Sequence, residues 1–159
     1  MKHLELFAGI GGFRRAMDVL TKDHIMDFHC IGYSEIDPKA EITYRANYTI
    51  NKNEIVMGDI VAFTSDKKNI KSLPKFDLLT GGFPCQTFSM MGNKAGFEED
   101  RGQMFFRIMD ILTVKRPKYV LLENVKNLWN HDKGRTFIRI KSELEAIGYH
   151  VYADIFNTA

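Results

Sequence analysis

The chain has 159 residues, of which 45% are hydrophobic and 26% charged, and its net charge of +2 is too small to indicate a nucleic-acid partner by itself. No stretch approaches the roughly 18 apolar residues of a membrane span, and the opening MKHLELFAG is too short an apolar run for a signal peptide. With only two cysteines, Cys30 and Cys85, and scattered histidines, we expect no disulfide framework, no metal site and a reduced, cytoplasmic setting.

Short apolar segments alternate with longer amphipathic ones along the chain. The segments expected to form strands are, in order, 4–9, 28–34, 54–59, 76–82, 119–125 and 149–156. The segments expected to form helices are 11–20, 37–48, 103–115 and 135–148. This alternation predicts an α/β fold, a doubly wound, mostly parallel sheet with helices on both faces. We expect residues 1–159 to be one domain that is truncated after about the sixth strand, because the chain stops directly after that segment.

A glycine-rich turn, Phe7-Ala8-Gly9-Ile10-Gly11-Gly12, links the first strand to the first helix. Such a turn lets a ligand approach the backbone closely, although a tight turn without a ligand is the plainer reading. Arg14 stands where the dinucleotide-binding fingerprint requires a small residue, which disfavours a nicotinamide-dependent oxidoreductase. Glu35 and Asp59 follow the second and third strands, where carboxylates could hold a ribose and an adenine amino group. The turn and the two acids together favour a nucleoside ligand without phosphates, such as S-adenosylmethionine.

The two cysteines occupy different contexts. Cys30 lies within a predicted strand and is expected to be structural, whereas Cys85 follows the fourth strand in a glycine-rich loop, at the edge where ligands bind in open α/β sheets. Glu123 ends the fifth strand and therefore reaches the same edge. A cysteine and a glutamate beside a nucleoside pocket would form a coherent catalytic pair, with a surface or capping role for Glu123 as the alternative.

These motifs, in this order and spacing, resemble the DNA cytosine-5 methyltransferase family. The resemblance rests on the turn at 7–12, Gly82-Phe83-Pro84-Cys85-Gln86 and Glu123-Asn124-Val125, and further blocks match at 58–60 and 96–102. It extends from about Leu4 to the last residue. The Rossmann-like fold of S-adenosylmethionine-dependent methyltransferases is therefore implied.

The resemblance also implies a chemistry. Cys85, as a thiolate, would add to C6 of cytosine while Glu123 contacts N3 and helps to protonate it, so that C5 can attack the methyl group of S-adenosylmethionine. The target base would have to leave the stack of double-stranded DNA.

By the same resemblance, further positions are assigned to the site. Those implied to bind the cofactor are Phe7, Gly9, Ile10, Gly12, Glu35, Ile36, Asp59, Ile60 and Pro84. Those implied to lie on the closing loop or to support the substrate site are Gln86, Ser89, Arg101 and Asn124. No metal is implied.

The family pattern continues beyond position 159. The part that selects the DNA sequence is expected to lie in a missing carboxyl-terminal half or a second subunit, and this chain alone is expected to be inactive. The family association points to restriction–modification in a bacterial or phage-infected cell. Two alternatives stay open: a methyltransferase that acts on tRNA, and a non-catalytic S-adenosylmethionine-binding subunit of a split enzyme.

Overall fold

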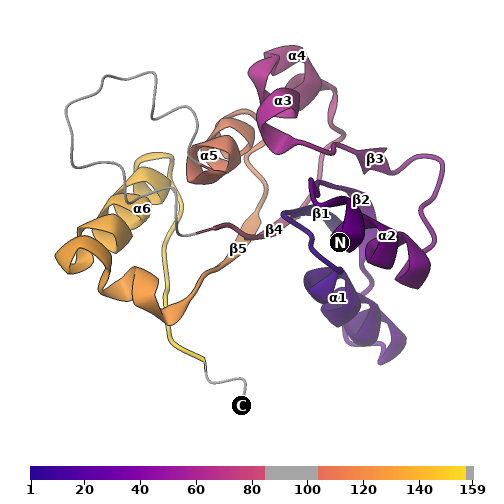
Figure 1. The fold of residues 1–159 in the computed structure, drawn as a ribbon, viewed down its shortest axis with the longest axis horizontal. Coiled ribbons are helices and arrows are strands. Elements are labelled where there is room, and N and C mark those ends of the chain that lie inside the picture. The colour runs from indigo at the N-terminus through magenta and orange to yellow at the C-terminus, as the bar shows by residue number, and fades with distance from the viewer. Residues whose placement is uncertain (85–103, 157–159) are drawn as a thin grey trace.

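A computed structural model describes residues 1–84 and 104–156 of the chain, and its centre is a five-stranded sheet in which all strands are parallel (Figure 1). The spatial order is β3-β2-β1-β4-β5. The strands are β1 (Lys2–Leu6), β2 (His29–Tyr33), β3 (Ile55–Val56), β4 (Leu78–Gly82) and β5 (Tyr119–Glu123). The order reverses between β1 and β4, so the edge formed by their carboxyl ends is the expected ligand-binding position.

Helices follow the strands and cover both faces of the sheet. They are α1 (Gly12–Lys22), α2 (Pro38–Asn47), α3 (Ile60–Ser65), α4 (Lys67–Ser72), α5 (Met104–Lys115) and α6 (Arg135–Ala146), with short 3₁₀ segments η3 (Lys126–Trp129) and η4 (His131–Gly134) after β5. Side chains from α3 to α6 contribute to the larger hydrophobic core, and Tyr44 of α2 stacks on Tyr33 in a smaller one. No helix in the described part of the chain is both long and apolar enough to cross a membrane.

Successive side chains of β1 point to opposite faces of the sheet. Leu4 and Leu6 are fully buried in the larger core, as expected for a strand that is covered on both sides. His3 and Glu5 point to the opposite face and are also buried, at 1% and 0% exposure. Two ionisable side chains therefore lie inside the protein, beneath α1 and α2.

The doubly wound parallel fold predicted from the sequence is confirmed, with the first five strands and all four predicted helices in place. The prediction of a sixth strand at 149–156 is wrong. Tyr149 and Val151 pack against the core and Tyr152 is 93% exposed, so the alternation holds over 149–152, whereas residues 153–156 are all exposed. The segment is fixed by side chains, including a 2.7 Å hydrogen bond from the Tyr149 hydroxyl to the Pro117 carbonyl, and pairs with no strand among the described residues.

Helices α3 and α4 were not predicted, because each has only six residues and too few turns to show a period. Their caps were visible in the sequence. Asp59 accepts a hydrogen bond from the Val61 amide, and Asp66 accepts one from the Lys68 amide, each at 2.8 Å. An aspartate that caps the first turn is a common start signal for a helix.

The buried face of α1 differs from the one that its apolar residues Phe13, Ala16, Met17 and Leu20 would form by themselves. Met17 is buried, but Ala16 is exposed and Arg14 is buried. The reason is polar pairing: the Arg14 guanidinium donates to both carboxylate oxygens of Glu54, at 2.8 and 3.2 Å, and to the Tyr44 hydroxyl at 3.3 Å. A hydrophobicity pattern cannot anticipate an arginine whose partner lies 40 residues away.

Glu5 is at the centre of this polar cluster. Its carboxylate accepts the Tyr44 hydroxyl at 3.0 Å and the Arg14 backbone amide at 3.2 Å. Burial nevertheless raises the pKa of Glu5 to about 7, because these bonds and the nearby guanidinium only partly replace the lost hydration. Burial also lowers the pKa of His3 to about 4.

We predict that Glu5→Gln removes a pH dependence of stability. Because the folded-state pKa of Glu5 is raised from 4.5 to about 7, its contribution is fully present below pH 4.5 and is lost as the pH rises through 7. The free energy of unfolding of the wild type, relative to the variant, should therefore fall between pH 4.5 and 7 by on the order of 3 kcal/mol.

Urea denaturation of both proteins across this range measures the difference, and the contribution of His3 cancels in it. Glu145→Gln, at an exposed position on α6, is the control and should show no such slope. A wild type and Glu5→Gln variant with parallel pH profiles would contradict an elevated pKa.

Candidate functional site

The turn between β1 and α1 has an unusual backbone. Phe7, Gly9 and Gly11 have φ angles of 52°, 56° and 91°, all in the left-handed region. Glycine adopts this region freely, but Phe7 does so at a cost, so contacts from the surrounding structure must hold it there. The Phe7 amide donates to the Ser34 hydroxyl at 3.2 Å, and the Ala8 amide donates to the Ser34 carbonyl at 2.9 Å.

Glu35 joins this turn to the end of β2. One carboxylate oxygen accepts the Gly9 amide at 2.6 Å, and the other accepts the amides of Ile36 and Asp37 at 2.8 and 2.7 Å. A carboxylate can accept about four hydrogen bonds, so Glu35 keeps one acceptor position open, on the oxygen that faces Gly9. Glu35 therefore organises two loops and is also able to accept one hydroxyl group of a ligand.

The turn offers unused backbone donors. No hydrogen bond within the described residues uses the amides of Ile10 and Gly12. A side-chain atom added at Gly9 or Gly12 would meet nothing within 4 Å. Free amides at a helix N-terminus beside open space can bind a polar or anionic group of a ligand.

The other residues predicted to bind a cofactor differ in how far they are exposed to solvent. The side chains of Ile10 and Ile36 are 61% and 71% exposed, so both offer apolar surface to a ligand. Asp59, three residues after β3, is exposed and caps α3 with one oxygen, which leaves its other oxygen available. Ile60 is only 4% exposed and belongs to the hydrophobic core.

The ends of β4 and β5 lie side by side. Gly82 is paired with Glu123 in the parallel register, and a side-chain atom added at Gly82 would lie 2.9 Å from a carboxylate oxygen of Glu123. Glu123 is exposed. The Asn124 side chain donates to the Phe83 carbonyl at 2.6 Å and accepts the Val125 amide at 2.9 Å. Asn124 thus joins the start of the loop after β4 to the start of the loop after β5.

Cys85 directly follows exposed Pro84 in the chain and, like Gln86, Ser89 and Arg101, lies outside the described residues. The other cysteine, Cys30, is half-buried in β2, and burial raises the pKa of its thiol to about 11. A thiol that stays protonated near neutral pH is a poor nucleophile, which agrees with the structural role predicted for Cys30.

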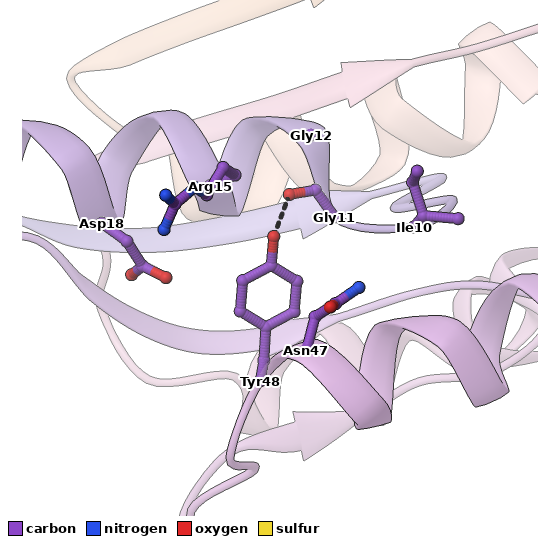
Figure 2. Close-up of a pocket in the computed structure, with 7 residues that line it drawn as sticks. All are labelled: Ile10, Gly11, Gly12, Arg15, Asp18, Asn47 and Tyr48. Carbon is purple, nitrogen blue, oxygen red and sulfur yellow. Dashed lines mark hydrogen bonds between the residues drawn. The ribbon is translucent and has the colours of Figure 1, made fainter.

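A groove of about 400 Å³ runs along the other side of the turn, between α1 and the end of α2 (Figure 2). Its lining includes Ile10, Gly11 and Gly12 but neither Glu35 nor Asp59. In Figure 2 the Tyr48 hydroxyl is directed at the Gly11 carbonyl, to which it donates at 2.7 Å. Sequence reasoning missed Tyr48, and the only signal for it was the pair Tyr44 and Tyr48, one helical turn apart.

Comparison with known proteins gives a family for this arrangement. The sequence profile of the C-5 cytosine-specific DNA methylase family matches residues 1–159. The type II methyltransferase M.DsaV of Dactylococcopsis salina is 44% identical over 151 residues, which cover 95% of this chain and 39% of that protein. The type II methyltransferase M1.ScrFI of Lactococcus lactis subsp. cremoris is 45% identical over 155 residues, which cover 98% of this chain and 36% of that protein.

A solved structure is similar in fold. It is a putative DNA modification methyltransferase encoded within an Escherichia coli prophage, with a TM-score of 0.66 and 20% sequence identity over 92% of this chain and 38% of that chain. At this identity the likeness shows a shared fold alone. The chain spans between a third and two fifths of the length of these three proteins.

Proposed function

The chain belongs to the C-5 cytosine-specific DNA methylase family, and from that premise we propose that it carries the cofactor-binding and catalytic part of a DNA cytosine-5 methyltransferase. The reaction is the transfer of a methyl group from S-adenosylmethionine to C5 of cytosine in double-stranded DNA. One observation carries the proposal: the β4–β5 register sets the Glu123 carboxylate beside Gly82, three residues before Cys85.

The donors and acceptors around the glycine turn suit S-adenosylmethionine. The free amides of Ile10 and Gly12 are suited to the carboxylate of its amino-acid part, since they lie at the N-terminus of α1. The open acceptor position of Glu35 suits a ribose hydroxyl, and the free oxygen of Asp59 suits the adenine amino group. The exposed side chains of Ile10 and Ile36 provide apolar surface for the adenine ring. Phe7 and Pro84 border the same strand edge, and Ile60 contributes from the core beneath it.

S-adenosylmethionine, when bound, supplies a methyl group on a positively charged sulfur, which is a strong electrophile. Cytosine C5 is a weak nucleophile, and Cys85 and Glu123 overcome this. The Cys85 thiolate forms a bond to C6 while N3 takes up a proton with the help of Glu123, so the ring becomes an enamine that is nucleophilic at C5. After methylation, a base takes up the C5 proton, the C6–sulfur bond breaks to release the Cys85 thiolate, and N3 returns its proton to Glu123, which restores the aromatic ring.

The loops at this edge have supporting roles in the proposal. Asn124 holds the Phe83 carbonyl and so positions the segment that leads to Cys85. Gln86, Ser89 and Arg101 are proposed to act in the loop that closes over DNA, after the target cytosine has been flipped out of the duplex. Because the relatives are named type II methyltransferases, we further propose a role in restriction–modification, in the cytoplasm of a bacterial or phage-infected cell. The DNA sequence is proposed to be selected by polypeptide beyond these residues.

We predict that Cys85→Ser abolishes methyl transfer to DNA and leaves the affinity for S-adenosylmethionine within about threefold of the wild type. A serine hydroxyl at neutral pH is a far weaker nucleophile than a thiolate, but the variant keeps the cofactor pocket. Transfer of a radioactive methyl group to duplex DNA, measured with the polypeptide that also contains the DNA-selecting part, and calorimetric titration with S-adenosylmethionine measure the two properties. Cys30→Ser is the control and should remain active; undiminished turnover by Cys85→Ser would rule out covalent catalysis by this residue.

We predict that Glu35→Ala weakens the binding of S-adenosylmethionine by about 1–3 kcal/mol, because it removes the ribose acceptor and leaves the Gly9, Ile36 and Asp37 amides without their partner. Isothermal titration calorimetry measures the change. Glu145→Ala, an exposed glutamate on α6, should bind as the wild type does. Equal affinities for Glu35→Ala and the wild type would remove Glu35 from the site.

A further inference from the structure

The turn that presents the Ile10 and Gly12 amides is held from two sides. On the strand side, Glu35 binds the Gly9 amide at 2.6 Å. On the helix side, the Tyr48 hydroxyl binds the Gly11 carbonyl at 2.7 Å (Figure 2). Because Gly11 is the residue before α1 and has a φ angle of 91°, the orientation of its peptide groups sets the direction of the neighbouring amides.

The contact between Tyr48 and Gly11 is close. A side-chain atom added at Gly11 would overlap the Tyr48 ring and would lie 3.0 Å from the Tyr44 ring, so only glycine allows the ring to reach this place. Tyr48 lies just after α2, where its amide donates to the Tyr44 carbonyl at 3.0 Å. The position of the hydroxyl is therefore determined by α2 as well as by the turn.

The Arg14 guanidinium contacts the Tyr48 ring and helps to hold it in place. The guanidinium carbon lies 5.0 Å from the centre of the Tyr48 ring and 5.6 Å from that of Tyr44, within the range of a cation–π interaction. Two hydrogen bonds to Glu54 fix the plane of the guanidinium. The Glu54 side chain is only 3% exposed, so this ion pair is shielded from competing water.

We propose that Tyr48 is a positioning residue for the cofactor and that the Arg14–Glu54 pair keeps it in place. The inference rests on the proposed function, since it takes the glycine turn as the S-adenosylmethionine site. By binding the Gly11 carbonyl, Tyr48 keeps the turn in the conformation that leaves the Ile10 and Gly12 amides free for the ligand. Without that bond the turn must be ordered when the ligand binds, and the affinity falls.

The test is the variant Tyr48→Phe, with Tyr149→Phe as its matched control. Each change removes one tyrosine hydroxyl that donates to a backbone carbonyl at 2.7 Å, and both tyrosines are half-buried. The two variants should therefore lose similar thermal stability. Only Tyr48→Phe removes a hydrogen bond to the turn, since the Tyr149 hydroxyl donates to the carbonyl of Pro117, which is far from the turn in the sequence.

Calorimetric titration with S-adenosylmethionine gives the dissociation constants. We expect the constant of Tyr48→Phe to exceed that of Tyr149→Phe by about three- to tenfold, the effect of one ordinary hydrogen bond. A ratio below about threefold overturns the positioning role, since the loss would then be one of general stability. Failure of the wild type to bind S-adenosylmethionine would instead overturn the proposed cofactor, and this inference with it.

Glu54→Gln tests the part assigned to the Arg14–Glu54 pair and changes no residue of the turn. A neutral partner weakens the hold on Arg14, so the dissociation constant should rise in the same direction as for Tyr48→Phe. An unchanged constant would overturn the part assigned to the Arg14–Glu54 pair. Backbone amide spectra of the ligand-free protein provide a readout apart from binding: the Gly9 and Gly12 signals should shift in Tyr48→Phe and stay in place in Tyr149→Phe.

Discussion

The turn from Phe7 to Gly12 requires left-handed backbone at three residues, and the positions of the proposed cofactor contacts at Ile10, Gly12 and Glu35 depend on how the protein holds it there. A non-glycine residue in this region is strained by about 1–3 kcal/mol, and Phe7 accepts that strain at the point where β1 ends. Ser34 and Glu35 accept hydrogen bonds from amides of the turn, and Tyr48 donates one to its Gly11 carbonyl, so the turn is fixed at three residues. The protein thus orders the turn during folding, so that a ligand does not have to do so.

Ionisable side chains are buried beneath the two helices that hold the turn. Glu5, Arg14 and Glu54 lie in the interior, where desolvation of an ion costs several kcal/mol unless hydrogen bonds replace the water. Arg14 and Glu54 are paired through two hydrogen bonds, whereas Glu5 relies on a tyrosine hydroxyl and a backbone amide, which leaves its pKa raised to about 7. Apolar side chains at these positions would avoid the cost of desolvation. They would not, however, fix the position of α1 relative to α2 through directed hydrogen bonds.

Sequence reasoning predicted the parallel sheet and the alternation of its strands and helices along the chain, because alternating apolar periods and glycine turns are local signals. It could not predict the Arg14–Glu54 pair or the bond from Tyr48 to Gly11, since each joins residues that are about 40 positions apart. It also predicted a strand at 149–156, where side chains alternate between buried and exposed only over 149–152 and pairing with another described strand does not follow. Of the site residues, Glu35 was predicted as a ligand contact, and its three bonds to backbone amides were unforeseen.

In the proposed mechanism, Cys85 attacks cytosine C6 in DNA while a methyl donor is bound at the glycine turn. The most direct measurement uses this chain together with the polypeptide that selects the DNA site. The protein is mixed with S-adenosylmethionine and duplex DNA in which 5-fluorocytosine replaces cytosine, and denaturing electrophoresis and mass spectrometry of peptides follow. Fluorine cannot leave C5 as a cation, so the account predicts a stable protein–DNA adduct that requires S-adenosylmethionine and maps to Cys85. An adduct at another residue, or none from protein that binds both S-adenosylmethionine and DNA, would contradict it.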